Sequence, residues 1–284
     1  MTGARLTLVH MIHLDGPGGG PQSLITQLQM LAPHFDQRVL HGGAGRVSAF
    51  CERMGIAHHC VALDRQRTLL RGWWQCWRLL RTHRPDVLVL HGQWAGPIGA
   101  LAGYLARIRH RVYIARWPAF YANWDLWRSL RNHLAERTAC ALSHRVICLT
   151  DSSRYQYLVR RLADEKKLCV VPNAIASANQ PRPERVQMLR ETHGFDRYAC
   201  NVVSVGRLVQ QKRCDWLLAG WKRVMETQPD AHLWIVGQGS HRERLKELAR
   251  SLGLDAHVTW IEDDSFSGAE FIAAGDLLAH TALF

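Results

Sequence analysis

Short apolar runs and segments of helical spacing alternate along nearly the whole chain. Strands separated by helices predict a parallel sheet with helices packed on its faces, because parallel neighbours need a long crossover connection. In the first part of the chain, the predicted strands span 6–12, 37–41, 58–62, 87–91, 111–115, 145–149 and 168–171, and the predicted helices span 24–31, 69–80 and 98–108.

The alternation is interrupted by a polar, proline-containing segment and then resumes. We predict that residues 176–199 are a linker with one short helix at 184–192. Beyond it, the predicted strands span 201–205, 232–236, 257–261 and 277–280, and the predicted helices span 215–226, 242–252 and 267–274. The sequence therefore predicts an α/β protein with an N-terminal Rossmann-like domain at 1–175 and a second domain at 200–284. This second domain has fewer elements than a complete Rossmann-like half and is expected to be incomplete.

The composition excludes several classes of protein. With 284 residues, 47% hydrophobic and 21% charged, the chain is typical of a globular protein and not of a disordered one. It has no apolar run near the roughly 20 residues that span a bilayer, and its start lacks the features of a secretion signal. We therefore expect a cytoplasmic protein. The eight cysteines form no Cys-x-x-Cys pair and the 16 histidines no His-Glu-x-x-His, so neither a metal site nor a disulfide framework is predicted.

The positive charge is confined to the first half of the chain. Residues 1–172 carry 23 Lys and Arg against 10 Asp and Glu, a balance of +13, whereas residues 173–284 carry 13 against 14, a balance of −1. Such an asymmetry indicates an anionic partner for the first half, such as a membrane surface or an acidic substrate. A general preference for arginine on a solvated face is the alternative. Nucleic acid is not expected, because the basic residues form no known reading module.

One strand-to-helix junction in the second half has the character of an anion site. The apolar run 202–205 stops at Gly206 and is followed by Arg207 and, five residues later, Lys212, before a helical pattern begins. Glycine lets a ligand approach the backbone, and two cations near a helix start can neutralise a diphosphate. An ordinary turn with two surface cations is the alternative. A second junction of this kind contains Gly237 and Gly239.

The first half has three candidate sites of its own. Residues 16–20 hold four glycines between the first strand and a helix, so that backbone amides could bind a phosphate or hydroxyl-rich ligand, or form only a flexible turn. His91 ends the strand at 87–91 and could contact a sugar or be structural. Arg116 follows the next strand and could bind an acceptor phosphate or cap the loop, and the aromatic stretch at 120–128, which includes Asn123, could line an acceptor site or touch a bilayer.

A second aromatic segment lies at 67–81, where Trp73, Trp74 and Trp77 are interspersed with arginines. This pattern is typical of an amphipathic helix at a membrane interface. An ordinary helix whose core face consists of Leu69, Trp73, Cys76 and Leu80 explains it equally well.

Taken together, these motifs resemble the retaining family 4 glycosyltransferases of the GT-B fold. The resemblance rests on the glycine loop at 16–20, the strand ending at His91, the element at 170–174 where the family usually has Pro-Asn-Gly, the Gly206-Arg207 to Lys212 signature, the segment at 235–239 and the segment at 274–278. The Arg and Lys signature is the most specific of these.

The resemblance implies a fold, a reaction and roles for residues. It implies two Rossmann-like domains that face each other across a cleft, a nucleotide diphosphate sugar as donor substrate, and no cofactor or metal. The resemblance implies three catalytic residues: Arg207 and Lys212 would bind the donor diphosphate and stabilise the leaving group, and His91 would be the active-site histidine near the donor sugar. The residues expected at the donor are Gly18, Gly19, Gly206, Arg207, Lys212, Gly237 and Gly239, and those on the acceptor side are Arg116 and Asn123. The family's pair of glutamates separated by seven residues would follow the strand at 277–280, and it is not found before Phe284.

We therefore predict a glycosyltransferase that acts on a lipid-linked or cell-envelope glycan acceptor, as a cytoplasmic protein peripheral to the inner face of the cytoplasmic membrane. A truncated, inactive relative that serves as a binding or scaffold protein is the alternative that the missing glutamates favour. A nucleotide-sugar epimerase of similar fold would act without an acceptor.

Overall fold

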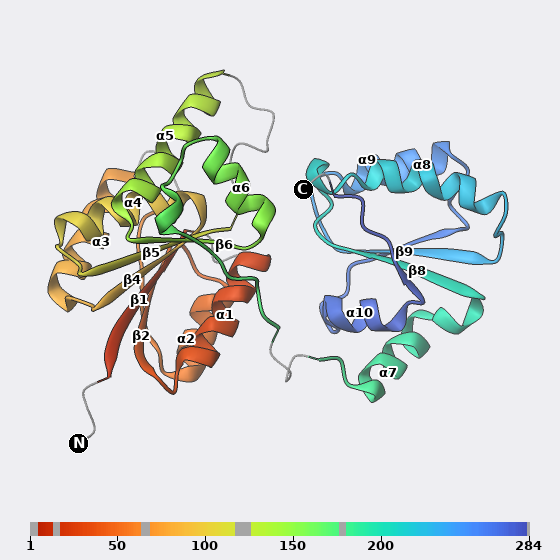
Figure 1. The fold of residues 1–284 in the computed structure, drawn as a ribbon. Coiled ribbons are helices and arrows are strands. Elements are labelled where there is room, and N and C mark those ends of the chain that lie inside the picture. Colours follow the sequence, from red (N-terminus) through yellow and green to blue (C-terminus); the bar gives the residue numbers. More distant parts are fainter. Residues whose placement is uncertain (1–4, 14–17, 64–68, 117–125, 176–179, 283–284) are drawn as a thin grey trace. The chain divides into compact units, whose positions relative to one another are not determined.

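The computed structural model describes residues 5–13, 18–63, 69–116, 126–175 and 180–282. The chain divides into two compact units, Met1–Ala176 and Ser177–Phe284. Each unit is a parallel sheet with helices on both faces, which is the α/β architecture that the alternating pattern predicts (Figure 1).

The first unit is built on a sheet of seven parallel strands in the order β3-β2-β1-β4-β5-β6-β7. The order reverses between β1 and β4, and in open α/β sheets such a switch point creates a crevice for ligands at the carboxyl ends of the strands. The strands are β1 (Leu6–Ile12), β2 (Phe35–His41), β3 (Ala57–Cys60), β4 (Val87–His91), β5 (His110–Ala115), β6 (Arg145–Cys148) and β7 (Leu168–Val170).

Helices cover both faces of this sheet (Figure 1). One face packs against α1 (Gly19–Leu31) and α2 (Arg46–Met54), whose buried residues form a core with Ile12 and Val39. The other face packs against α3 (Leu69–His83), α4 (Gly92–Leu105), α5 (Leu126–Leu142) and α6 (Asp151–Val159). A 3-10 turn, η3 (Glu165–Lys167), precedes β7.

The second unit has a four-stranded parallel sheet in the order β10-β9-β8-β11. Helices α8 and α9 share a core on one face, and α7 and α10 share a core on the other (Figure 1). The elements are α7 (Pro183–His193), η5 (Phe195–Arg197), β8 (Cys200–Val205), η6 (Gln210–Lys212), α8 (Cys214–Met225), β9 (Ala231–Val236), α9 (Arg242–Ser251), β10 (Val258–Ile261), α10 (Gly268–Ala274) and β11 (Leu277–Leu278).

All eleven predicted strands are present, and β1 and β4 have the predicted bounds. Helix α7, which lies in the predicted linker, packs through Leu189 and Val186 onto the second unit's core, so this unit begins before residue 200. Helices α2, α5 and α6 were not among the predicted elements.

The structure decides between the two interpretations of the tryptophan-rich helix α3. Cys76 and Leu80 are buried, and Trp73 and Trp77 pack against the same core. Trp74 is half exposed, and the guanidinium of Arg78 lies 5.5 Å from its ring centroid. The core-facing interpretation is therefore confirmed, and α3 offers a membrane only one tryptophan.

Candidate functional site

Two loops at the carboxyl ends of β8 and β9 lie against each other in the second unit. The Leu208 N–H donates to the Gln238 carbonyl at 2.8 Å, and the His241 N–H donates to the Leu208 carbonyl at 2.9 Å. A Cβ on Gly237 would lie 2.2 Å from the Gly206 carbonyl oxygen, and one on Gly239 would lie 2.3 Å from the Leu208 carbonyl oxygen. Both positions therefore require glycine, so that the backbones can approach this closely.

The predicted cations flank this loop pair. Arg207 is exposed, and the Lys212 stem lies beside Gly206, since its Cε is 3.8 Å from the place of a Gly206 Cβ. Thr281 Oγ1 donates to the Lys212 and Arg213 carbonyls at 3.1 and 3.0 Å. Partial burial and, secondarily, the Lys212 ammonium lower the pKa of His280. A small pocket is lined by Ser204, Val205, Gly206, Arg207, Leu208, Lys212, Cys214, His280 and Thr281.

Thus Gly206, Arg207 and Lys212 share one pocket, and Gly237 and Gly239 shape the loop beside it. Two cations around a glycine turn that lacks side-chain bulk suit a diphosphate. His280 and Thr281 were not among the predicted site residues, because they join Lys212 from 68 or more positions away in the sequence.

In the first unit, the structure brings His91 and Arg116 together. The Arg116 guanidinium donates from Nη2 to His91 Nδ1 at 2.8 Å. On the other side of the ring, His91 Nε2 lies 3.1 Å from Nδ1 of His10. His10 and Gln37 were not predicted as site residues. The local signal for His10 is a polar residue within the apolar run of β1, whereas Gln37 lies beside other polar residues of β2 and has no such signal.

Burial sets the charge of this group. His10 and His91 are 0% and 3% exposed. Desolvation lowers the pKa of His10 to about 4 and lowers the pKa of His91 well below its usual value, with the Arg116 charge as the second cause for His91. Burial also lowers the pKa of Arg116, to about 10, so the guanidinium stays charged at neutral pH. The site thus holds two neutral imidazoles and one cation.

The glycine loop begins helix α1 next to this cation. Gly18 is the N-cap with a φ of 157°, and no side chain caps the first turn. A Cβ on Gly20 would lie 3.7 Å from Arg116 Cδ, so the helix start and the guanidinium are neighbours. Gly19 is exposed at this start. Asn123, the other predicted acceptor-side residue, lies outside the described residues.

Matches to known protein families show to which family this chain belongs. The family described as Glycosyltransferase Family 4 matches residues 17–178, which is more than half of the chain, and Glycosyl transferases group 1 matches residues 189–283. The chain belongs to glycosyltransferase family 4.

Solved structures show the same fold for this family 4 chain. It superimposes on Anabaena HepE in complex with UDP-glucose with a TM-score of 0.80 over 98% of this chain and 74% of HepE, at 19% identity. The fold is therefore the two-Rossmann-like arrangement of GT-B glycosyltransferases, as the motifs indicated.

This chain matches a smaller share of the length of its curated relatives. An Escherichia coli UDP-Gal:alpha-D-GlcNAc-diphosphoundecaprenol alpha-1,3-galactosyltransferase is 25% identical over 86% of this chain and 65% of its own length. An uncharacterised glycosyltransferase of Methanocaldococcus jannaschii is 22% identical over 67% of this chain and 48% of its own. The family 4 chain thus spans about half to two thirds of these relatives.

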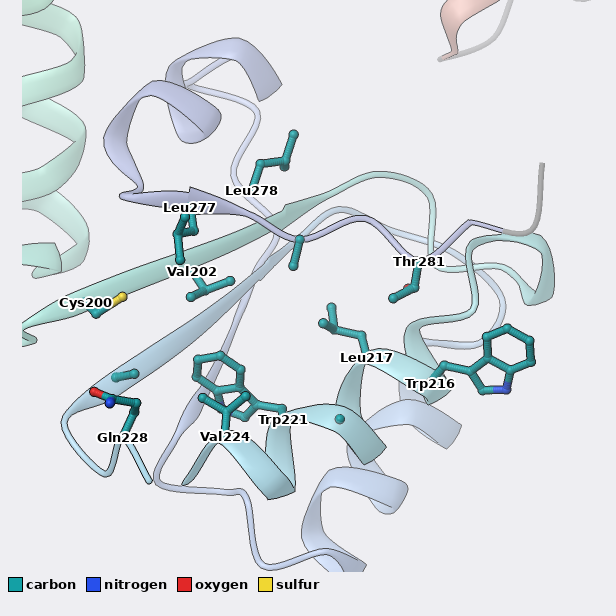
Figure 2. Close-up of a pocket in the computed structure, with 13 residues that line it drawn as sticks. Cys200, Val202, Trp216, Leu217, Trp221, Val224, Gln228, Leu277, Leu278 and Thr281 are labelled. Atoms are coloured by element: carbon teal, nitrogen blue, oxygen red, sulfur yellow. The ribbon is translucent and has the colours of Figure 1, made fainter. Parts of the chain in front are cut away.

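A larger groove in this family 4 chain is lined by none of the predicted site residues, although it shares Thr281 with the small pocket. It has a volume of about 640 Å³ and is walled by α8 and by the β8 and β11 strands. Figure 2 shows Leu217, Trp221 and Val224 projecting from α8 toward β8. It reaches Cys200 and Ala231 at the amino ends of β8 and β9 and is almost entirely apolar. Because open α/β sheets bind polar ligands at the opposite strand ends, this groove is not a candidate for a nucleotide sugar.

In the described parts of the family 4 chain, no group of three or more His, Cys, Asp or Glu residues is arranged to hold a metal ion. None of the described helices is both long and apolar enough to cross a membrane.

Proposed function

We propose that this protein is a retaining glycosyltransferase that transfers a sugar from a nucleotide diphosphate sugar to a lipid-linked or cell-envelope glycan. The observation that carries the proposal is the glycine loop pair of the second unit, with Arg207 and Lys212 beside it. Family membership supports the reaction class. The names of two relatives support a UDP-sugar donor and a diphospholipid-linked acceptor.

In this reaction, the bond between the sugar C1 and the diphosphate oxygen breaks, and a bond from C1 to an acceptor hydroxyl oxygen forms. The hydroxyl proton is released to solvent, and the nucleoside diphosphate leaves with one additional negative charge, so that atoms and charge balance. Arg207 and Lys212 would stabilise this charge as it develops, which is an electrostatic task that needs no metal. Gly206, Gly237 and Gly239 would let the donor lie against the backbone.

The first unit has residues of its own that would bind the acceptor. Arg116 is a partly buried cation beside the start of α1, and its Nε has no hydrogen-bond partner among the described residues. A phosphate of the donor or of a lipid-linked acceptor would satisfy it, together with the amides of Gly18 and Gly19. Asn123 would join Arg116 on the acceptor side, and His91 would be the active-site histidine near the donor sugar.

The test is a transfer assay with the complete protein, a panel of nucleotide sugars and a diphospholipid-linked acceptor. We expect release of a nucleoside diphosphate and a product with retained anomeric configuration. If the protein shows no hydrolysis and no transfer with any donor, the proposal is contradicted. Tight nucleotide binding without transfer would favour the binding or scaffold alternative. Product formation without an acceptor, as an isomerised nucleotide sugar, would favour an epimerase.

Substitutions then test the donor residues. We expect Arg207→Ala and Lys212→Ala each to weaken UDP binding by about tenfold or more, since a charge-assisted hydrogen bond contributes roughly 1.5–3 kcal/mol. Arg213→Ala is the matched control. The Arg213 guanidinium already lies 2.8 Å from the Asp215 carboxylate and 4.0 Å from the Trp216 ring centroid, so its removal should leave UDP affinity nearly unchanged. Unchanged affinity in both Arg207 and Lys212 variants would refute their assigned role.

We further propose that the first unit acts at an anionic membrane surface, on the cytoplasmic side, where lipid-linked acceptors are held. Helix α5 supports this proposal more strongly than α3 does. Its Leu126, Trp127, Leu130 and Leu134 are exposed on one side, whereas Asn132, Glu136, Ala139 and Cys140 are buried on the other. An apolar stripe flanked by exposed arginines is the pattern of a helix that lies in a lipid interface.

A further inference from the structure

Four polar side chains form a continuous row across adjacent strands of the first unit. Gln37 lies on β2, His10 on β1, His91 at the end of β4, and Arg116 directly follows β5. The ring and amide atoms of the first three are linked at 3.1 Å each, from Gln37 Oε1 to His10 Nε2 and from His10 Nδ1 to His91 Nε2. The row ends on one side at Arg116 and on the other at the Leu28 carbonyl of α1, to which Gln37 Nε2 donates at 2.8 Å.

The two ends determine the direction of every hydrogen bond between them. A backbone carbonyl can only accept, so the Gln37 amide nitrogen faces Leu28 and its oxygen faces His10. A guanidinium can only donate, so His91 Nδ1 must be unprotonated. The His91 proton therefore lies on Nε2 and points to His10 Nδ1, and the His10 proton lies on Nε2 and points to Gln37 Oε1. Each of the four contacts then has one donor and one acceptor, with both rings neutral.

This arrangement leaves His91 without a spare ring nitrogen. Both of its ring nitrogens are hydrogen-bonded to other members of the row. The member of the row that lies beside the start of α1 is therefore Arg116. Buried polar rows of this kind are rigid when every member is satisfied, and costly when one member is not. The orientation of Arg116 thus depends on residues two and three strands away.

We propose that His10 and Gln37 are positioning residues, which hold His91 as the Nε2–H tautomer and so orient Arg116 at the start of α1. The function of Arg116 in binding a phosphate rests on the proposed glycosyltransferase activity, whereas the order of the row does not. Reversal of the row would place a His91 Nδ1–H against an Arg116 N–H, and two donors repel each other. No charged group other than Arg116 contacts the row among the described residues of β1, β2, β4, β5 and α1.

The tautomers can be measured directly by NMR of the full chain labelled with 15N-histidine. Long-range proton–nitrogen spectra distinguish the two neutral tautomers from the charged ring. His10→Gln and His91→Gln assign the two rings among the 16 histidines. We expect both rings to be neutral Nε2–H tautomers at pH 7 and to stay so at pH 5.5. A His91 ring that is charged or protonated at Nδ1 at pH 7 would overturn the proposal.

Gln37→Met tests the coupling along the row, since it removes the acceptor for His10 without changing the size of the side chain greatly. We expect the signals of both His10 and His91 to shift or to show mixed tautomers, and the Arg116 Nε–H to exchange with solvent about tenfold faster or more, because opening of the row becomes easier. Gln187→Met, at an exposed position of α7, is the matched control and should change none of these signals. Unchanged signals in Gln37→Met would refute the positioning role.

If Gln37→Met does not fold, Gln37→Glu provides the second variant. A carboxylate beside His10 Nε2 favours the charged imidazole, so we expect the His10 ring to become protonated at neutral pH. A His10 ring that remains an unaltered neutral tautomer would refute the row. None of these measurements uses a sugar donor, so a protein without transferase activity can still confirm or refute the positioning residues.

Discussion

At the scale of single residues, Glu136 is the most unusual side chain in the core of the first unit. It lies on α5, is 1% exposed, and accepts hydrogen bonds from the Tyr113 and Tyr157 hydroxyls at 2.9 Å. Desolvation raises the pKa of its carboxyl to about 7, although the two hydroxyl donors act in the opposite direction. Folding therefore takes up a proton at this site in weakly acidic solution.

This uptake predicts a pH dependence of stability. The folded pKa is raised above the unfolded value of 4.5, so the stabilisation is fully present below about pH 4.5 and is lost as the pH rises to about 7. The loss amounts to about 3 kcal/mol at 1.36 kcal/mol per pH unit. We expect the difference in the free energy of unfolding between the wild type and Glu136→Gln to fall by about 3 kcal/mol between pH 4.5 and pH 8. Urea titrations at each pH measure this difference.

An exposed carboxylate provides the control for Glu136→Gln. Glu165→Gln removes an exposed carboxylate that pairs with Arg154 at 2.6 Å, and it should change the pH dependence little. His10, with a pKa lowered to about 4, makes stability rise with pH below about 6.5, but it does so in wild type and Glu136→Gln alike. A difference between these two proteins that does not vary with pH would contradict the prediction.

That residues of one loop share a pocket could be predicted from the sequence, whereas the pairing of residues on different strands could not. Gly206, Arg207 and Lys212 belong to a single strand-to-helix turn, where local spacing carries the information. His10 contacts Gln37 and His91 over 27 and 81 positions, and such a pairing depends on the strand order, which no local pattern contains.

At the scale of elements, the loop pair after β8 and β9 is the feature on which the proposed donor site depends. Gly237 has a φ of 134°, which side chains rarely adopt, and its missing Cβ makes room for the Gly206 carbonyl. We expect Gly237→Ala to lower the free energy of unfolding by about 2 kcal/mol or more and to weaken UDP binding, because the loops must separate. Chemical denaturation and calorimetric titration measure the two effects.

Gly220→Ala is the matched control for the loop pair. Gly220 lies within α8, and a Cβ there would meet nothing within 4 Å. We expect this substitution to raise stability by about 0.5–1 kcal/mol, since alanine favours the helix, and to leave UDP affinity unchanged. Equal effects of the two substitutions would mean that the close approach of the loops is unimportant.

Helix α5 shows why part of the fold escaped prediction. Its Leu126, Leu130 and Leu134 are exposed on one side, whereas Ala139 and Cys140 are buried on the other side beside the polar Glu136. Hydrophobic periodicity finds a helix whose apolar residues gather on one face, and those of α5 are divided between two. Helices such as α8, which bury Leu217, Leu218 and Trp221, obey the rule and were predicted.

At the scale of the whole molecule, the charge asymmetry coincides with the division into units. The basic residues of 1–172 all fall within the first unit, which also carries the exposed apolar stripe of α5. An apolar stripe alone would bind any lipid surface, and positive charge alone would bind any polyanion. Their combination on one unit favours an anionic membrane.

This combination predicts how binding to vesicles depends on lipid and salt. We expect the protein to bind vesicles of phosphatidylcholine and phosphatidylglycerol more strongly as the anionic share rises. Binding should fall as salt increases from about 0.1 to about 1 M, where the screening length shrinks from ~10 to ~3 Å. Sedimentation with the vesicles measures the bound fraction. Binding that is absent, or insensitive to salt, would contradict the proposed membrane partner.

The contribution of α5 can be separated from that of the charge. Leu130→Glu places a carboxylate in the middle of the apolar stripe and should reduce vesicle binding several-fold, since it removes buried apolar area and adds repulsion from the lipid. Met188→Glu makes the same change in charge at a comparably exposed residue of α7 in the second unit, where we expect little effect. If both substitutions reduce binding equally, net charge alone accounts for the attraction, and α5 is not the membrane-facing element.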